Sequence, residues 1–184
     1  MKLLIIGGKA KSGKNTLAHY LREELKKYGY KACIINLTEP LYSYARNHFE
    51  WNEYSDEKPR EFLQKVGIEI IKEKLGKKTF LLDRAIEDIE ILSCFFNAFI
   101  IADARLQMEF TYLKERFPTA KTIKLIRPGY DTNLTLEEQK HITEVDLDNY
   151  NDFNYIIECQ NLRELKKAAK DIVEIEEGEV LLIN

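Results

Sequence analysis

The stretch GKAKSGKNT, from Gly8 to Thr16, contains the residues whose types and spacing most directly predict a ligand site. Between Gly8 and Lys14 it fits the pattern of a glycine, four variable residues, a second glycine and a lysine. Glycines let the backbone curl so that its N–H groups face an anion, and a following helix adds the positive end of its dipole. Lys14 would then contact the β- and γ-phosphates of a nucleotide as a compact point charge. The stretch therefore predicts a phosphate-binding loop.

The residue after the lysine narrows this prediction. A strict motif has Ser or Thr there, because that hydroxyl binds magnesium, but this chain has Asn15 followed by Thr16. A loop ending in Gly-Lys-x-Thr is common in kinases of small substrates, so Thr16 is the candidate metal-binding hydroxyl. Magnesium in such sites keeps several waters and is held largely by nucleotide phosphates. The loop favours an ATP- and Mg²⁺-dependent kinase of a small phosphorylated acceptor.

A second set of polar residues begins at the end of the apolar run FIIADAR, where Asp103 and Arg105 are two positions apart. Ligands of parallel α/β sheets bind at the carboxyl ends of strands, so Asp103 could orient a magnesium-bound water. It could equally begin the next helix as its N-cap. Transfer between two anions needs several cations, and the arginines that could supply them are Arg60, Arg84, Arg105 and Arg127. Each alone could be a solvated surface charge. The catalytic candidates are Lys14, Asp103, Arg105 and Arg127.

Alternating apolar and helical patterns must position these residues. The run at 2–8 predicts a buried strand, 15–29 an amphipathic helix and 31–37 a second strand, which together form a βαβ unit. Further strands are expected in NAFIIADAR, AKTIKLIRPG and FNYIIEC, and further helices in LQMEFTYLKERF and NLRELKKAAKDIVEI. Strands that alternate with helices predict an α/β fold with a five-stranded parallel sheet and helices on both faces.

We expect one domain with two inserted segments. The core comprises residues 1–38, 94–127 and 151–184, the insertion residues 39–93, and the polar segment residues 128–150. The insertion is expected to be helical, including one helix over 58–76, and the segment GEVLLIN is expected to form a short terminal strand. The polar segment is either a mobile flap or a short helix with flanks, and it would close as a lid that excludes water.

Composition excludes several classes of function. The 184 residues are 45% hydrophobic and 32% charged with a net charge of −3, which gives no electrostatic case for nucleic-acid binding. No apolar run has the length of a membrane span, and no signal-peptide pattern is present, so we expect a cytoplasmic protein without membrane partners. Cys33, Cys94 and Cys159 form no paired motif and are expected to be buried, reduced thiols.

Five stretches, in order, give the chain a resemblance to a known family. They are GGKAKSGKNTLA, TEPLYSYARNHFEW, EKPREFLQKVGIEI, FIIADARLQMEF and HITEVDLDNYNDFNYIIECQNLREL. Along nearly its whole length the chain resembles the deoxynucleoside monophosphate kinases of bacteriophages and some bacteria, within the P-loop NMP-kinase superfamily. The resemblance implies a three-layer α/β/α P-loop kinase fold, ATP and Mg²⁺ as cofactors, and a deoxynucleoside monophosphate as the second substrate.

The resemblance also implies roles for individual residues. The donor phosphates would be held by Lys11, Ser12, Gly13, Lys14 and Thr16, with Gly8 and Asn15 in the same loop. The segment 39–76 would bind the acceptor nucleotide. The residues matching substrate-binding motifs are Arg60, Gln64, Glu69, Lys72, Arg105, His141 and Glu144. The residues that would bind the metal are Thr16 and Asp103. Tyr42, Phe49 and Trp51 could stack on a base or simply pack in a core.

The departures from the family pattern concentrate in the insertion. Glu39 replaces an aspartate, Tyr42 a lysine, Ile68 a threonine and Lys72 an arginine, while Asn15 replaces an aspartate in the loop. Lysine in place of arginine loses a bidentate grip on phosphate. Two alternatives therefore stay open: another small-molecule P-loop kinase, of the phosphomevalonate or dephospho-coenzyme A type, and a nucleotide-binding module without turnover. The accepted base, the sugar and the formation of a homodimer also stay open.

Overall fold

A computed structural model describes residues 1–52, 54, 59–129 and 134–181 of the chain. The chain divides into two compact units. The larger unit comprises Met1–Ile35 and Leu92–Asn184, and the smaller unit comprises Asn36–Ile91. Among the described residues, no helix combines the length and the apolar character needed to cross a membrane.

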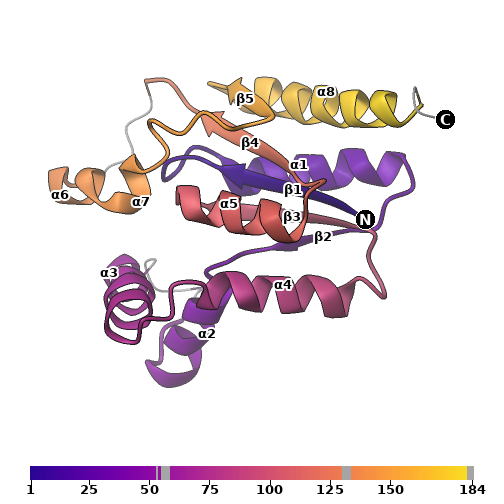
Figure 1. Ribbon diagram of the computed structural model, residues 1–184. Helices are drawn as coiled ribbons and strands as arrows, with labels where there is room; N and C mark the ends of the chain where they lie inside the picture. Colours follow the sequence, from indigo (N-terminus) through magenta and orange to yellow (C-terminus); the bar gives the residue numbers. More distant parts are fainter. Residues whose placement is uncertain (53, 55–58, 130–133, 182–184) are drawn as a thin grey trace. The chain divides into compact units, whose positions relative to one another are not determined.

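The larger unit is built on a five-stranded parallel sheet with the strand order β2-β3-β1-β4-β5 (Figure 1). The strands are β1 (Lys2–Gly7), β2 (Ala32–Ile35), β3 (Ala98–Ala104), β4 (Lys121–Ile126) and β5 (Tyr155–Glu158). β1 and β3 are almost completely buried because they are central and nearly all apolar, whereas β5 at the edge alternates between half-buried and exposed residues. The predicted α/β fold with a five-stranded parallel sheet is confirmed.

Helices cover both faces of this sheet. On one face, α1 (Lys14–Lys27) and α8 (Leu162–Leu181) pack together through fully buried side chains such as Leu17 of α1 and Ala169 of α8. Leu4 and Ile6 of β1 belong to the same core. Because side chains alternate along a strand, the neighbouring β1 residues face the opposite side, where α5 (Gln107–Arg116) buries Phe110. These two layers fix the strand ends that carry the candidate site.

The smaller unit is helical. Its elements are α2 (Glu39–His48), α3 (Arg60–Gln64), the π-helix η1 (Lys65–Lys74) and α4 (Phe80–Leu92). Its core consists of buried Leu41, Ile71 and Leu81, with Leu63, Val66 and Phe80 packed against them. A β-carbon on Gly67 would lie 2.9 Å from Cδ1 of Leu41, so this glycine permits the close approach of η1 to α2.

The segment predicted to be helical over 58–76 is helical from Arg60 to Lys74, but it contains two helix types. A short α-helix from Arg60 passes into a π-helix at Lys65, and the Leu75 N–H donates to the carbonyl of Ile70, five residues back, at 2.9 Å. Apolar side chains at four-residue spacing predict a helix but do not distinguish the α register from the wider π register. Residue 58 lies outside the described residues.

The terminal strand predicted over 178–184 is wrong where it is described. Residues 178–181 continue α8, and 182–184 lie outside the described residues. The last turns of α8 are held against the sheet, because Glu177 pairs with Lys2 at 2.6 Å and Glu176 accepts a hydrogen bond from Tyr155.

The expectation of three buried thiols requires correction. None of the three cysteines, all of which the structure describes, forms a disulfide, but only Cys159 is buried, while Cys33 is half-buried and Cys94 is exposed. Cys94 follows the end of α4 and precedes β3, where the connecting segment runs over the surface. Burial raises the pKa of the Cys159 thiol, so this cysteine is the less reactive type.

Candidate phosphate-binding site

The loop between β1 and α1 has a backbone that only particular residues can form. A β-carbon on Gly8 would lie 2.4 Å from the carbonyl oxygen of Leu125, and the φ angle of Gly8 is +148°. Lys11 and Gly13 also have positive φ angles, 56° and 103°. Turns with such residues direct backbone N–H groups into concavities that bind anions. The glycines of the motif are therefore required by close packing and by backbone conformation.

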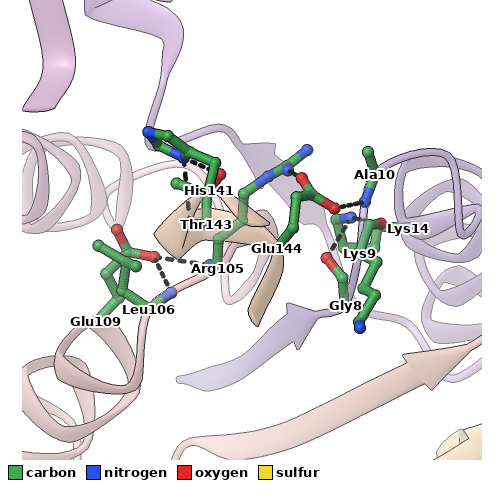
Figure 2. Close-up of polar contacts among 10 residues, drawn as sticks. All are labelled: Gly8, Lys9, Ala10, Lys14, Arg105, Leu106, Glu109, His141, Thr143 and Glu144. Carbon is green, nitrogen blue, oxygen red and sulfur yellow. Dashed lines mark hydrogen bonds and ion pairs between the residues drawn. The ribbon is translucent and has the colours of Figure 1, made fainter. Parts of the chain in front are cut away.

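Lys14 lies folded over this loop (Figure 2). Its Nζ donates hydrogen bonds to the carbonyl oxygens of Gly8, at 2.7 Å, and Lys9, at 2.6 Å. The side chain is buried, so a positive charge is held where the loop turns. This is the placement that a phosphate oxygen at the loop requires.

The hydroxyl of Ser12 supplies an independent test of whether the loop fits a nucleotide phosphate. Ser12 is buried, and its Oγ has no hydrogen-bond partner among the residues that the structure describes. Leaving a buried polar atom without a partner costs about 1–3 kcal/mol, so an oxygen-rich ligand that accepts from this hydroxyl would recover that energy. The residues present fit the phosphates of ATP.

The two residues after the lysine differ in burial. Asn15 is exposed and Thr16 is half-buried, both in the first turn of α1. The described residues contain no group of three or more His, Cys, Asp or Glu side chains that could hold a metal ion. Thr16 and Asp103 are the predicted protein contacts for a magnesium ion that phosphate oxygens and waters would hold.

Strand register brings the other candidates to the same edge of the sheet. Gly7, directly before the loop, is the register partner of both Ala104 on β3 and Lys124 on β4. Asp103 and Arg105 flank Ala104 and are half-buried, while Arg127 follows the last residue of β4. The carboxyl ends of β1, β3 and β4 therefore carry Lys14, Asp103, Arg105 and Arg127 close to one another in the fold.

The carboxylate of Glu144 joins two of these strand ends (Figure 2). Glu144 lies on the short helix α7 (Ile142–Val145) and is buried. Its Oε2 accepts the backbone N–H of Ala10 in the loop at 2.8 Å, and its Oε1 forms an ion pair with Nη1 of Arg105. Nearby, the ring of His141 caps α7, with Nδ1 2.9 Å from Oγ1 of Thr143.

Residues 144–150, which we call the strap, are tied to the core at several points. Asp146 accepts the N–H of Gln107 at 2.6 Å, and the Lys124 ammonium donates to the carbonyl of Leu147 at 2.6 Å. Leu147 is buried beside Gly7, since a β-carbon on that glycine would lie 3.1 Å from it. Burial, and then the charge of Asp152, raise the pKa of Tyr150 at the end of the strap.

The polar segment predicted over 128–150 thus contains short helices where it is described, in line with one of the two alternatives. The first is α6 (Leu136–Lys140), which begins with a capping box: Thr135 accepts the N–H of Glu138 at 3.2 Å, and the Glu138 side chain accepts the N–H of Thr135 at 2.8 Å. The second is α7. Residues 130–133 lie outside the described residues.

The N-terminus of α5 is closed by residues that the sequence analysis missed. The Glu109 carboxylate accepts the N–H groups of Arg105, at 2.7 Å, and Leu106, at 3.0 Å, and Asp146 accepts the next one. These donors are therefore already used and do not offer a second anion site. A glutamate three residues after a helix start is a known capping signal, which could have revealed Glu109; nothing in the sequence points to Asp146.

The residues predicted to bind the acceptor lie in the smaller unit. Arg60 and Gln64 are one turn apart on α3 and half-buried, as is Lys72 on η1, whereas Glu69 on η1 is exposed. Arg84 forms an exposed ion pair with Glu87 on α4.

The aromatic side chains considered for base stacking contact other aromatics of the same unit. The ring centroids of Tyr42 and Trp51 are 5.5 Å apart, and those of Phe49 and Phe62 are 4.8 Å apart. Offset and edge-on pairs at these distances stabilise packing.

Comparisons with known proteins agree with this architecture. A family model described as chromatin associated protein KTI12 matches residues 1–85, which include the phosphate loop. No curated protein matches the chain by sequence. Shikimate kinase from Bacteroides thetaiotaomicron aligns with a TM-score of 0.55 at 16% identity over 96% of this chain and 98% of that one. The chain has the fold of a P-loop kinase.

Two further shikimate kinases agree over similar lengths. The enzyme from Aquifex aeolicus has a TM-score of 0.50 at 15% identity and covers 98% of this chain and 99% of its own. The enzyme from Acinetobacter baumannii, in complex with shikimate, has a TM-score of 0.51 at 14% identity, with coverages of 96% and 93%. At such identities the likeness concerns the fold, while chemistry has to be argued from the site.

Proposed function

We propose that this protein is a Mg²⁺- and ATP-dependent phosphotransferase whose acceptor is a deoxynucleoside monophosphate. The observation that carries the proposal is the loop from Gly8 to Lys14, in which a buried ammonium covers the turn and the Ser12 hydroxyl has no partner within the described part of the chain. Both features suit a bound phosphate chain, and the P-loop kinase fold supports transfer of its terminal phosphoryl group.

The residues at the loop and at the neighbouring strand ends would have separate roles in the reaction. Lys14 neutralises the β- and γ-oxygens, and Arg105 and Arg127 offset the charge that accumulates as two anions approach. An acceptor phosphate oxygen forms a bond to the γ-phosphorus while the bond to the β–γ bridging oxygen breaks, giving ADP and the diphosphate product. Magnesium, when bound, offsets further charge on the phosphates, with Thr16 and Asp103 as its protein contacts. No covalent intermediate with the protein is required.

The choice of acceptor rests on the resemblance in the segment 39–76. Arg60 and Lys72 are cations of the type that an acceptor phosphate requires, and Gln64 and Glu69 match polar positions of the same motifs. The region 128–150 would act as the lid, with its described second half anchored as the strap.

A second candidate is a kinase of another small molecule. The similarity to shikimate kinases over nearly the whole chain favours it, because those enzymes share the fold and phosphorylate a different class of acceptor. Kinases of the phosphomevalonate and dephospho-coenzyme A type belong to the same alternative. The two candidates share the donor site and differ in the acceptor alone.

An acceptor panel tests the proposal. The protein is incubated with ATP, Mg²⁺ and each common dNMP, NMP, shikimate, phosphomevalonate or dephospho-coenzyme A, and ADP release is followed against a control without acceptor. We expect the largest turnover with one or more dNMPs. Turnover with a non-nucleotide alone would move the assignment to the second candidate. ATP binding without turnover on any acceptor would indicate a nucleotide-binding module.

A further inference from the structure

The carboxylate of Glu144 occupies groups that an anionic ligand would otherwise seek. One oxygen accepts the Ala10 N–H of the phosphate loop at 2.8 Å, and the other pairs with the Arg105 guanidinium. Glu144 is only 7% exposed. A buried carboxylate is stable only with such partners, so the three groups form one polar unit. This unit could either block the loop until a nucleotide displaces it, or hold Arg105 in place for the nucleotide.

The anchoring of the strap decides between these two roles. Displacing Glu144 would require the chain around it to move. Two residues later, the Asp146 side chain accepts the Gln107 N–H at 2.6 Å, and the Asp146 carbonyl accepts the Gln107 side-chain amide at 2.6 Å. Leu147 is buried and its carbonyl accepts from Lys124. A segment with a buried leucine and this many part-buried hydrogen bonds supports a residue that stays in position.

Two cations meet at the same stretch of the loop. The ammonium of Lys14 lies on the carbonyls of Gly8 and Lys9, and Glu144 holds Arg105 to the next residue, Ala10. Without a negative charge between them, the two cations would repel each other. Arg105, whose side chain is 26% exposed, would then adopt many conformations in water. A guanidinium has five N–H donors, so Arg105 can pair with Glu144 and still donate to a phosphate.

We propose that Glu144 is a positioning residue that holds the guanidinium of Arg105 beside Ala10, ready to contact the terminal phosphate of a nucleoside triphosphate. This inference rests on the proposed function and refines it, because Glu144 acts through Arg105 instead of touching the acceptor. A residue that acts this way affects the triphosphate more than the diphosphate, since only the triphosphate carries the terminal group.

The test compares the affinities of the full chain for AMP-PNP, a non-hydrolysed ATP analogue, and for ADP, both with Mg²⁺, by calorimetric titration. The variants are Glu144→Gln, Arg105→Ala and the two combined, with Glu115→Gln as the control because Glu115 is an exposed acid on α5. We expect Glu144→Gln to weaken AMP-PNP binding about tenfold, the scale of one charged hydrogen bond, and ADP binding less than about twofold. The double variant should bind AMP-PNP no more weakly than Arg105→Ala, because the two residues act as one unit.

Three results would overturn the proposal. Tighter AMP-PNP binding in Glu144→Gln would show that the carboxylate blocks the loop against nucleotide binding. Equal losses for both nucleotides, or a lower melting temperature with unchanged affinities, would make its role structural. If Glu144→Gln does not fold, Arg105→Lys keeps the charge but loses the forked geometry, and it should show the same selective loss; equal affinities would contradict the proposal. These affinities need no acceptor, so failure here is distinct from failure of the acceptor panel.

Discussion

The phosphate loop and the helical unit from Asn36 to Ile91 hold their polar residues by different means. In the loop, backbone geometry and buried contacts fix the position of each group: Gly8 is pressed against Leu125, and Lys14 is bonded to two carbonyl oxygens. In the helical unit, Arg60, Gln64 and Lys72 are half-buried side chains on α3 and a π-helix with a small core. Under the proposed function, donor recognition would be built into the fold, while acceptor recognition would depend on individual side chains that can change without changing the fold.

The largest effect in the comparison of the two regions is expected when the lysine of the loop is removed. Lys14→Ala should lower phosphoryl transfer by about a hundredfold to a thousandfold, because an electrostatic contact to the developing charge is lost in a water-poor site. Single-turnover transfer from ATP measures the loss, and circular dichroism checks that the fold is kept. Lys26→Ala, an exposed lysine at the far end of α1, should keep full activity. Normal transfer by Lys14→Ala would remove the loop from the mechanism.

The next largest effect concerns the backbone of the loop. Gly8→Ala should lower the free energy of unfolding by about 1–3 kcal/mol, because it combines a strained φ angle with a collision against the Leu125 carbonyl. Nucleotide binding should be lost as well. Urea titrations with and without ATP measure both. Gly29→Ala is the matched control, since its φ is +83° but open space surrounds its β-carbon, so only the conformational cost of about 1 kcal/mol remains. Equal losses in the two variants would show that the close packing of the loop is unimportant.

In the helical unit, a single side chain should change acceptor binding without affecting the donor. Arg60→Ala is expected to raise the KM for the acceptor about tenfold and to leave the KM for ATP unchanged, because one charged contact to the acceptor phosphate is lost. Steady-state kinetics with each substrate varied in turn measures this. Lys65→Ala, an exposed cation at the start of η1, should match the unchanged protein in both constants. A parallel rise in the KM for ATP would contradict the separation of the two regions.

The smallest effect is expected from the aromatic pair of the helical unit. Phe49→Ala removes an exposed ring in edge contact with Phe62 and should cost about 0.5–1.5 kcal/mol of unfolding free energy. Thermal and urea unfolding measure this. Tyr54→Ala, at a side chain that is 92% exposed, should be neutral. A loss above about 3 kcal/mol for Phe49→Ala would place this ring in a true core and weaken the contrast with the loop.

The two regions also differ in how far the sequence predicted them. The sheet was predictable because β1 and β3 consist almost entirely of apolar residues. The loop was predictable because the spacing of its glycines and lysine is the known pattern of a phosphate-binding loop. The π-helix was not, since apolar spacing does not separate two helical registers. The continuation of α8 over residues 178–181 was also not predicted, because buried Glu176 and half-buried Glu177 bond to residues of distant strands.

The sequence identified candidate site residues but not the contacts between them. Lys14, Arg105 and Glu144 were each identified by motif, yet no spacing rule states that a carboxylate from α7 bonds the loop amide of Ala10. That contact depends on the path of the strap, which is set by buried Leu147 and by the side chain of Asp146. Long-range contacts of this kind depend on tertiary packing, which local sequence patterns do not predict.

The packing of α8 against α1 has a consequence for synthesis of the protein on the ribosome. The phosphate loop and α1 are translated early, but Leu17 and Leu21 of α1 share one buried core with residues of α8, and the pair that joins Lys2 to Glu177 spans 175 positions of the chain. Until α8 emerges, the part of this apolar core that α8 covers stays exposed to water, where it can bind chaperones or aggregate. Nucleotide binding should therefore be a late event, and translation stalled before Leu162 should release a chain that cannot retain ATP.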